Sequence, residues 1–241
     1  MKGALDRRLF DRRLFLAAAL AFALIVLAGF ARTYYAKGLF GTPPLPSGLV
    51  HLHGLLMTAW VALFVAQVRF ISTKRIRLHQ RLGYAGIGLA TLIIASGIPT
   101  ALRAAKYGSA ASPPDVPPLS FLLVPLSDLV MFGLFFGAAV YYRRRPAAHK
   151  SLMLLTALNF LPPALARIPV ASLQALGPLW FFGVPTALAL LCLGLDARHS
   201  GHVNKVFLTG TLLLVASYVG RLAFMSTGAW ISVATWMTSL V

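Results

Sequence analysis

Long apolar runs separated by short polar segments make up most of the chain. A helix that crosses a bilayer needs about 20 mostly apolar residues, and seven runs are close to that length. They cover residues 13–32, 48–70, 79–101, 119–142, 149–168, 178–196 and 203–226. This pattern predicts an all-α polytopic membrane protein, a single bundle domain of residues 1–241 with seven transmembrane helices. Pro162 and Pro163 are expected to kink the fifth helix.

Lysine and arginine are divided unevenly between the two sets of connections. Sixteen of the 22 lie in the amino-terminal segment and in the second-to-third, fourth-to-fifth and sixth-to-seventh connections. Cytoplasmic loops are enriched in these residues, so the amino terminus is predicted to be cytoplasmic. Seven crossings then put the carboxyl terminus in the periplasm. Residues 230–241 are too short to cross, and we expect them to rest at the outer interface.

The composition agrees with a membrane environment. Apolar residues make up 59% of the chain and charged residues only 11%, with a formal net charge of +17. So basic a protein often binds nucleic acid, but here the bases lie at the ends of apolar helices. The predicted partner is therefore a bilayer with anionic headgroups at its cytoplasmic face. The single cysteine, Cys192, cannot form an intramolecular disulfide.

An Arg-x-x-x-His spacing occurs at three of the inner connections. The three copies are Arg75 with His79, Arg145 with His149, and Arg198 with His202. The helices that precede them also repeat, since residues 50–57 can be aligned with residues 124–131. This pattern indicates one helix followed by three hairpins related as parallel repeats.

Four motifs carry a family resemblance. They are GFARTYY at 29–35, VHLHG at 50–54 followed by Trp60 and Gln67, LHQRLG at 78–83, and AHKSLM at 148–153. The chain resembles, over nearly its whole length, a family of uncharacterised seven-helix bacterial inner-membrane proteins. That resemblance implies a multi-pass protein of the bacterial inner membrane and implies no activity. The hairpin ending in HKxLM is similar to hairpins of small proteins of cytochrome oxidase maturation and, more distantly, of haem-handling membrane proteins.

The three repeated histidines are the main candidates for cofactor binding. If the helices form a bundle, His79, His149 and His202 begin the third, fifth and seventh helices at one depth. Two imidazoles are enough for a b-type haem, and three could hold a metal ion. Arg75 and Arg145 would repel a divalent cation but would bind haem propionates, so haem is favoured over zinc. The alternative is that each histidine is an interfacial residue that hydrogen-bonds headgroups or loop carbonyls.

A second candidate site lies toward the outer end. Asp128 is the only acid well inside a predicted span, and a carboxylate there needs a partner, a proton or water. Its candidate partners are Arg167 and Arg221, and we expect a polar cluster that also contains His53 and Arg32. The cluster is interpreted either as a salt-bridge network that fixes helix packing or as a ligand pocket or proton-linked site.

These features leave three functions open and identify no catalytic residue. The leading hypothesis is a haem-binding or redox-handling membrane protein. The alternatives are a non-catalytic accessory subunit of a larger membrane complex or a lipid- or quinone-binding protein, and a small-solute or proton-linked transporter. The sequence has no glycine-rich phosphate loop, HExxH motif or CxxC pair, which argues against nucleotide and soluble-type hydrolase chemistry.

Overall fold

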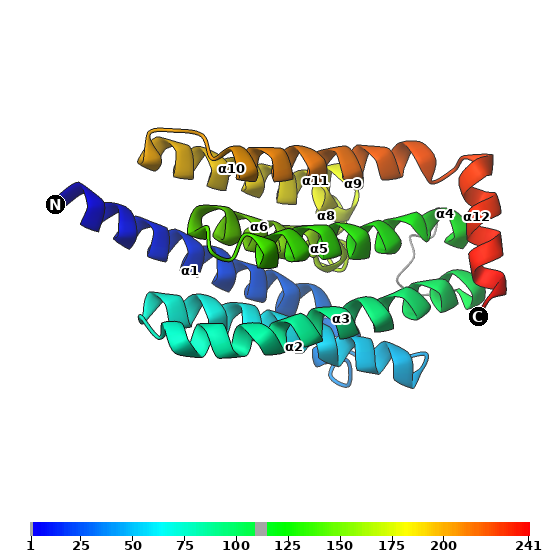
Figure 1. Cartoon of the computed structure of the whole chain (residues 1–241). Coiled ribbons are helices and arrows are strands. Elements are labelled where there is room, and N and C mark those ends of the chain that lie inside the picture. Colours follow the sequence, from blue (N-terminus) through cyan, green and yellow to red (C-terminus); the bar gives the residue numbers. More distant parts are fainter. Residues whose placement is uncertain (1, 109–114) are drawn as a thin grey trace.

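The long helices run along one axis, and the two ends of the chain lie at opposite ends of the bundle (Figure 1). The computed structural model describes residues 2–108 and 115–241, with side chains from residue 9 onward. Every regular element in this described part is helical, which confirms the all-α prediction there. The basic side chains of residues 2–8, used above to orient the chain, lie outside the described side chains.

Within residues 2–108 and 115–241, six helical segments are long and apolar enough to cross a membrane. These segments comprise α1 (Lys2–Phe30) with the π-helical turn η1 (Ala31–Tyr35), α2 (Gly48–Ser72), α3 (Ile76–Tyr107), α4 (Pro118–Phe121) with α5 (Leu123–Tyr141), α9 (Pro178–Phe181) with α10 (Gly183–Ser200), and α11 (Lys205–Phe224). The shorter helices are α6 (Pro146–Asn159), α7 (Pro162–Leu165), α8 (Ala171–Gln174) and α12 (Gly228–Ser239). The architecture is that of a multi-pass membrane protein.

The run predicted to form the fifth transmembrane helix, residues 149–168, is divided into two helices. α6 ends at Asn159 and α7 begins at Pro162. Proline lacks an amide hydrogen, and its ring clashes with the carbonyl four residues earlier, so Pro162 and Pro163 interrupt the helix instead of only kinking it. The hydropathy of the run depends only on how many of its residues are apolar, so it does not reveal that the helix is interrupted. The described residues therefore contain six long apolar segments, and a seventh transmembrane helix stays a prediction.

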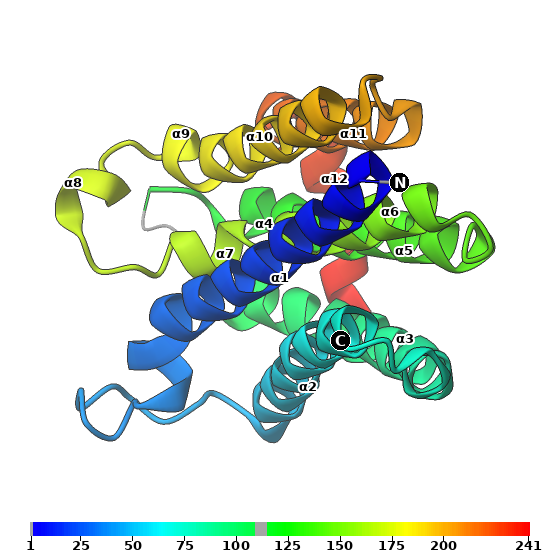
Figure 2. The same ribbon diagram turned by 90° about the vertical axis from the view of Figure 1, so that its left-hand side faces the viewer.

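The divided segment lies at the centre of the bundle. α6 contacts α1, α5, α10 and α11, and every side chain from Ser151 to Asn159 except Met153 is buried. The α2–α3 hairpin lies on one side of it and the α10–α11 hairpin on the other (Figure 2). The surrounding helices expose large apolar side chains such as Leu24, Leu134 and Val219, as expected for helices that face lipid.

One end of the bundle is closed by the last helix. α3 continues to Tyr107 instead of ending near residue 101, and Ala101 and Leu102 pack with Leu122 and Ala234 in a small second core. α12 crosses this end, close to the carboxyl terminus (Figure 1). Its Trp230 indole donates a hydrogen bond to the Leu119 carbonyl oxygen over 2.9 Å. Position at the outer interface remains a prediction for this helix.

The approach of α1 to α7 depends on a glycine. Gly29 is buried, and a Cβ atom at this position would overlap the backbone carbonyl of Ala164. We expect Gly29→Ala to lower the free energy of unfolding by about 1–3 kcal/mol, because backbone cannot move aside as a flexible side chain can. Thermal unfolding in detergent measures this loss. Gly88→Ala on α3 is the matched control, since no atom lies within 4 Å of its added Cβ; an equal loss in both variants would contradict the packing explanation.

Candidate functional site

His79 and His149 lie next to each other at the end of the bundle that holds the amino terminus. His79 is near the start of α3 and His149 near the start of α6, and the turns that precede these helices are at that end (Figure 1). The two ring centroids are 6.2 Å apart, and the ring planes meet at 79°. Two histidines that are 70 residues apart in the sequence thus form one pair.

The first two of the three copies of the Arg-x-x-x-His spacing have the same local structure. Arg75 is the N-cap residue of α3, and the His79 amide donates to the Arg75 carbonyl oxygen over 3.1 Å. Arg145 is the N-cap residue of α6, and the His149 amide donates to its carbonyl oxygen over 3.0 Å. Each histidine therefore occupies the first helical turn, and each arginine is exposed beside it.

The ring nitrogens differ in their partners. Nδ1 of His149 is 2.8 Å from the carbonyl oxygen of Ala139. A carbonyl only accepts, so Nδ1 carries the proton and Nε2 keeps a free lone pair. Nδ1 of His79 is buried and has no hydrogen-bond partner within the described residues. Histidines that bind metals commonly donate their second ring N–H to a carbonyl, as His149 does.

The separation of the rings fits two ligands on a single metal centre. Imidazoles that bind an ion from opposite sides have centroids roughly 6 Å apart, because each metal–nitrogen bond is about 2 Å and each nitrogen is about 1 Å from its centroid. The unpartnered His79 nitrogen is consistent with such a role. Within residues 9–108 and 115–241, no group of three His, Cys, Asp or Glu side chains is placed to hold a metal ion.

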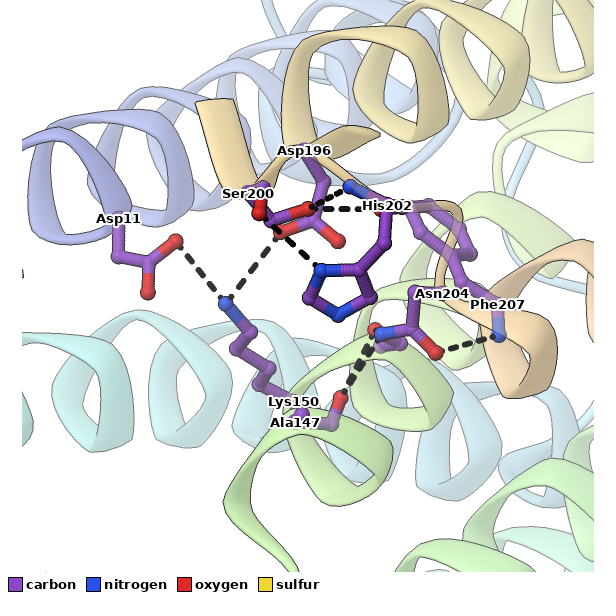
Figure 3. Close-up of polar contacts among 9 residues, drawn as sticks. Asp11, Ala147, Lys150, Asp196, Ser200, His202, Asn204 and Phe207 are labelled. Atoms are coloured by element: carbon purple, nitrogen blue, oxygen red, sulfur yellow. Dashed lines mark hydrogen bonds and ion pairs between the residues drawn. The ribbon is translucent and has the colours of Figure 1, made fainter. Parts of the chain in front are cut away.

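His202 does not join the pair, and the prediction that it begins a helix is wrong. Gly201 ends α10 with a φ of 76°, and α11 begins only at Lys205. Asn204 caps α11 by accepting a hydrogen bond from the Phe207 amide over 3.2 Å. His202 is exposed in the intervening turn, where its Nδ1 is 3.1 Å from the Ser200 carbonyl oxygen (Figure 3). The Gly201–Asn204 pair thus interrupts the third repeat.

At the second candidate site, Asp128 pairs with Arg221. The Arg221 guanidinium donates from NH1 to Oδ1 of Asp128 over 2.5 Å, and both side chains are buried. Nε and NH2 of the same arginine donate to Ser217 Oγ over 3.2 and 3.0 Å. Its Cζ also lies 5.1 Å from the ring centroid of Tyr218. The side-chain amide of Asn159 donates to the Asp128 backbone oxygen over 2.8 Å, so this network reaches the end of α6.

The other three residues expected in the outer cluster have separate partners. His53 Nδ1 is 3.0 Å from Ser96 Oγ between α2 and α3. Arg167 donates to the Pro163 carbonyl oxygen over 2.6 Å, and its guanidinium lies over the Phe30 ring. Arg32 is exposed and lies 5.3 Å from the centroid of Phe40. Of the five residues, the structure brings only Asp128 and Arg221 into contact.

The comparisons give no name for either site. No family model, curated protein or solved structure matches the chain. The family resemblance drawn from the sequence motifs therefore stays a prediction.

Sequence reasoning missed an ion cluster near the amino-terminal end. Lys150 Nζ lies 2.9 Å from Asp11 Oδ1 and 3.6 Å from Asp196 Oδ1 (Figure 3). The three residues come from α6, α1 and α10. The sequence feature that could have predicted this cluster is the scarcity of acidic residues. The chain has only five Asp and Glu in all, and Asp11 and Asp196 lie at the inner ends of predicted spans. The cluster connects the central helix to two of its neighbours.

We expect Lys150→Gln to loosen α1 from α6. Loss of the ammonium leaves Asp11 and Asp196 without their cation, and because these groups are partly exposed the stability cost is small, about 1 kcal/mol or less. Amide hydrogen exchange in α1 should accelerate while exchange in α3 stays unchanged. Lys205→Gln, an exposed base at the start of α11, is the control. Unchanged exchange in α1 would show that the cluster does not hold this helix.

Proposed function

We propose that this chain is a seven-span bacterial inner-membrane protein that binds a b-type haem between His79 and His149. The observation that carries the proposal is the histidine pair itself, with ring centroids 6.2 Å apart. A haem held by two histidines supplies one-electron transfer.

Each histidine has features that suit a residue that would hold haem iron. The Ala139 carbonyl holds the orientation of the His149 ring through Nδ1, so Nε2 would be the atom that holds the iron of a bound haem. The buried Nδ1 of His79 lacks a partner among the described residues, and an unpaired buried nitrogen is costly unless something binds it. Ligation by the pair relieves that cost.

Arg75 and Arg145 are the proposed propionate partners. Both are exposed N-cap residues four positions before a candidate ligand. Guanidinium groups pair strongly with carboxylates, and Arg145 is placed against the Tyr142 ring, 5.7 Å from its centroid. The same arginines would bind anionic headgroups at the cytoplasmic face.

The chain path supports seven crossings. The six long segments and the central α6–α7 segment together make an odd number of passes, which agrees with chain ends at opposite ends of the bundle (Figure 1). An interrupted helix is tolerated at membrane depth when protein surrounds it, and α6 is surrounded by α1, α5, α10 and α11. The basic loops then favour a cytoplasmic amino terminus and a periplasmic carboxyl terminus.

Absorption spectroscopy tests the haem proposal. The protein is produced with ample haem, purified in detergent, and measured first oxidised and then reduced with dithionite. We expect a Soret band that shifts on reduction, together with the sharp visible bands of six-coordinate low-spin haem. Protein that folds as a monodisperse species without a Soret band would overturn the proposal. Reporter fusions at each terminus test the orientation separately.

A further inference from the structure

A groove lies between α5 and α11, beneath α12, at the opposite end of the bundle from the histidine pair. It has a volume of about 280 Å³. Its apolar walls include Leu123, Leu126, Val130 and Met131. Val130 is 61% exposed on the outer surface of α5, so the groove is open to the acyl chains of the bilayer. Any ligand would enter from the membrane.

The polar part of the groove is a serine backed by a buried arginine. Ser217 lines the groove, and its Oγ accepts two hydrogen bonds from Arg221. Arg221 is 2% exposed and is held in turn by Asp128. A hydroxyl oxygen has two lone pairs, and both are used here. The hydroxyl of Ser217 is left as a donor, and the positive charge behind it strengthens that donor.

A second hydroxyl lines the same groove. Ser127, one residue before Asp128, contributes to the wall and makes no hydrogen bond to any described residue. None of the residues that line the groove is charged. The indole N–H of Trp230, which closes the groove, is already bonded to Leu119. The groove therefore offers hydroxyl donors and an aromatic side chain to an uncharged ligand that accepts hydrogen bonds.

We propose that this groove binds the oxidised head group of an isoprenoid quinone, with the Ser217 hydroxyl donating to one quinone carbonyl oxygen. An oxidised quinone ring is flat and uncharged, carries carbonyl acceptors and has no donor on the ring. Its isoprenoid tail suits the bilayer opening beside Val130. The volume admits a substituted ring and leaves the tail outside. This binding site does not depend on the haem proposal, because it shares no residue with the histidine pair.

Titration with a decyl-tailed benzoquinone tests the site. The purified protein is held in detergent, and binding is followed by quenching of tryptophan fluorescence, to which Trp230 contributes. Ser217→Ala should weaken binding about five- to tenfold through loss of one hydrogen bond to the carbonyl. Ser232→Ala on α12, whose hydroxyl bonds to the Gly228 carbonyl outside the groove, should bind as the unaltered protein does. Trp230→Phe should remove the largest part of the quenching.

A second pair of variants covers the case in which Ser217→Ala does not fold. Val130→Phe fills the groove from the lipid side and should abolish binding, whereas Val219→Phe, at a similarly exposed position of α11 that is not part of the groove, should not. Binding that is unaffected by both Val130→Phe and Ser217→Ala would overturn the proposal. Competition by ester-linked phosphatidylcholine but not by its ether-linked analogue would also overturn it, because the occupant would then be a lipid ester. A failed haem spectrum leaves this titration unaffected.

Discussion

Arg221→Met is expected to destabilise the protein by about 3–5 kcal/mol, since removal of one partner of a buried ion pair leaves the other charge uncompensated. Asp128 is buried, and Arg221 is its only ion-pair partner in the described part of the chain. The substitution also removes both hydrogen bonds to Ser217. The Arg221 guanidinium also lies 5.7 Å from the centroid of the Phe182 ring and 5.1 Å from that of Tyr218; methionine keeps a long apolar side chain beside these rings but loses the cation–π attraction. Unfolding in mixed micelles of increasing denaturing detergent measures the loss.

A double substitution separates the charge from the packing. Asp128→Asn in the Arg221→Met background removes the unpaired carboxylate, so the double variant should be more stable than Arg221→Met alone. Such non-additivity is the signature of two groups that act together. If the losses of the two single variants simply add, the pair does not stabilise the fold as a unit. Arg103→Met, an exposed arginine of α3, is the control and should change stability little.

His149→Ala and His79→Ala are each expected to remove most of the bound haem. Both residues are proposed ligands of the iron, and each substitution would leave only one imidazole of the pair to hold the haem. The ratio of Soret absorbance to protein absorbance measures the haem content after purification from cells supplied with haem. Any residual haem should change from a six-coordinate low-spin to a five-coordinate high-spin spectrum.

His202→Ala is the matched control for these two variants. His202 is exposed in the turn between α10 and α11, and its ring nitrogen contacts only the nearby Ser200 carbonyl. Its haem content should equal that of the unaltered protein. Haem content that is retained in both His79→Ala and His149→Ala, or lost in His202→Ala, would contradict the assignment of the ligands. Thermal unfolding of each variant shows whether a loss of haem comes from unfolding.

Much of the local structure could be predicted from sequence. Six of the seven apolar runs overlap the long helical segments found in the described residues, because a segment in hydrocarbon must satisfy its backbone internally and be apolar over about 20 residues. The Arg-x-x-x-His spacing marks two helix starts correctly, at Arg75 and Arg145. Its third copy fails, because Gly201 and Asn204 supply a helix end and a new cap that the spacing alone does not reveal.

Side-chain partners were harder to predict. Arg167 and Arg221 were predicted to lie at about the same depth in the membrane, so both were candidate ion-pair partners of Asp128. The structure pairs the Asp128 carboxylate with Arg221. Arg167 instead donates to a backbone carbonyl of its own segment. The sequence places Lys150 among the basic residues of an inner loop, but its side chain lies between two carboxylates, from α1 and α10. The groove beside Ser217 had no signal in the sequence.

Local sequence was sufficient to predict an all-helical membrane protein and the approximate positions of most of its long helices, because hydrophobicity, helix caps and prolines act within a few residues of the chain. Three-dimensional packing was needed to show that α6 lies at the centre, that His79 contacts His149 without His202, and that Asp128 pairs with Arg221. These contacts depend on how each helix is rotated and packed against its neighbours. That rotation is a property of several distant segments together, so no single stretch of sequence encodes it.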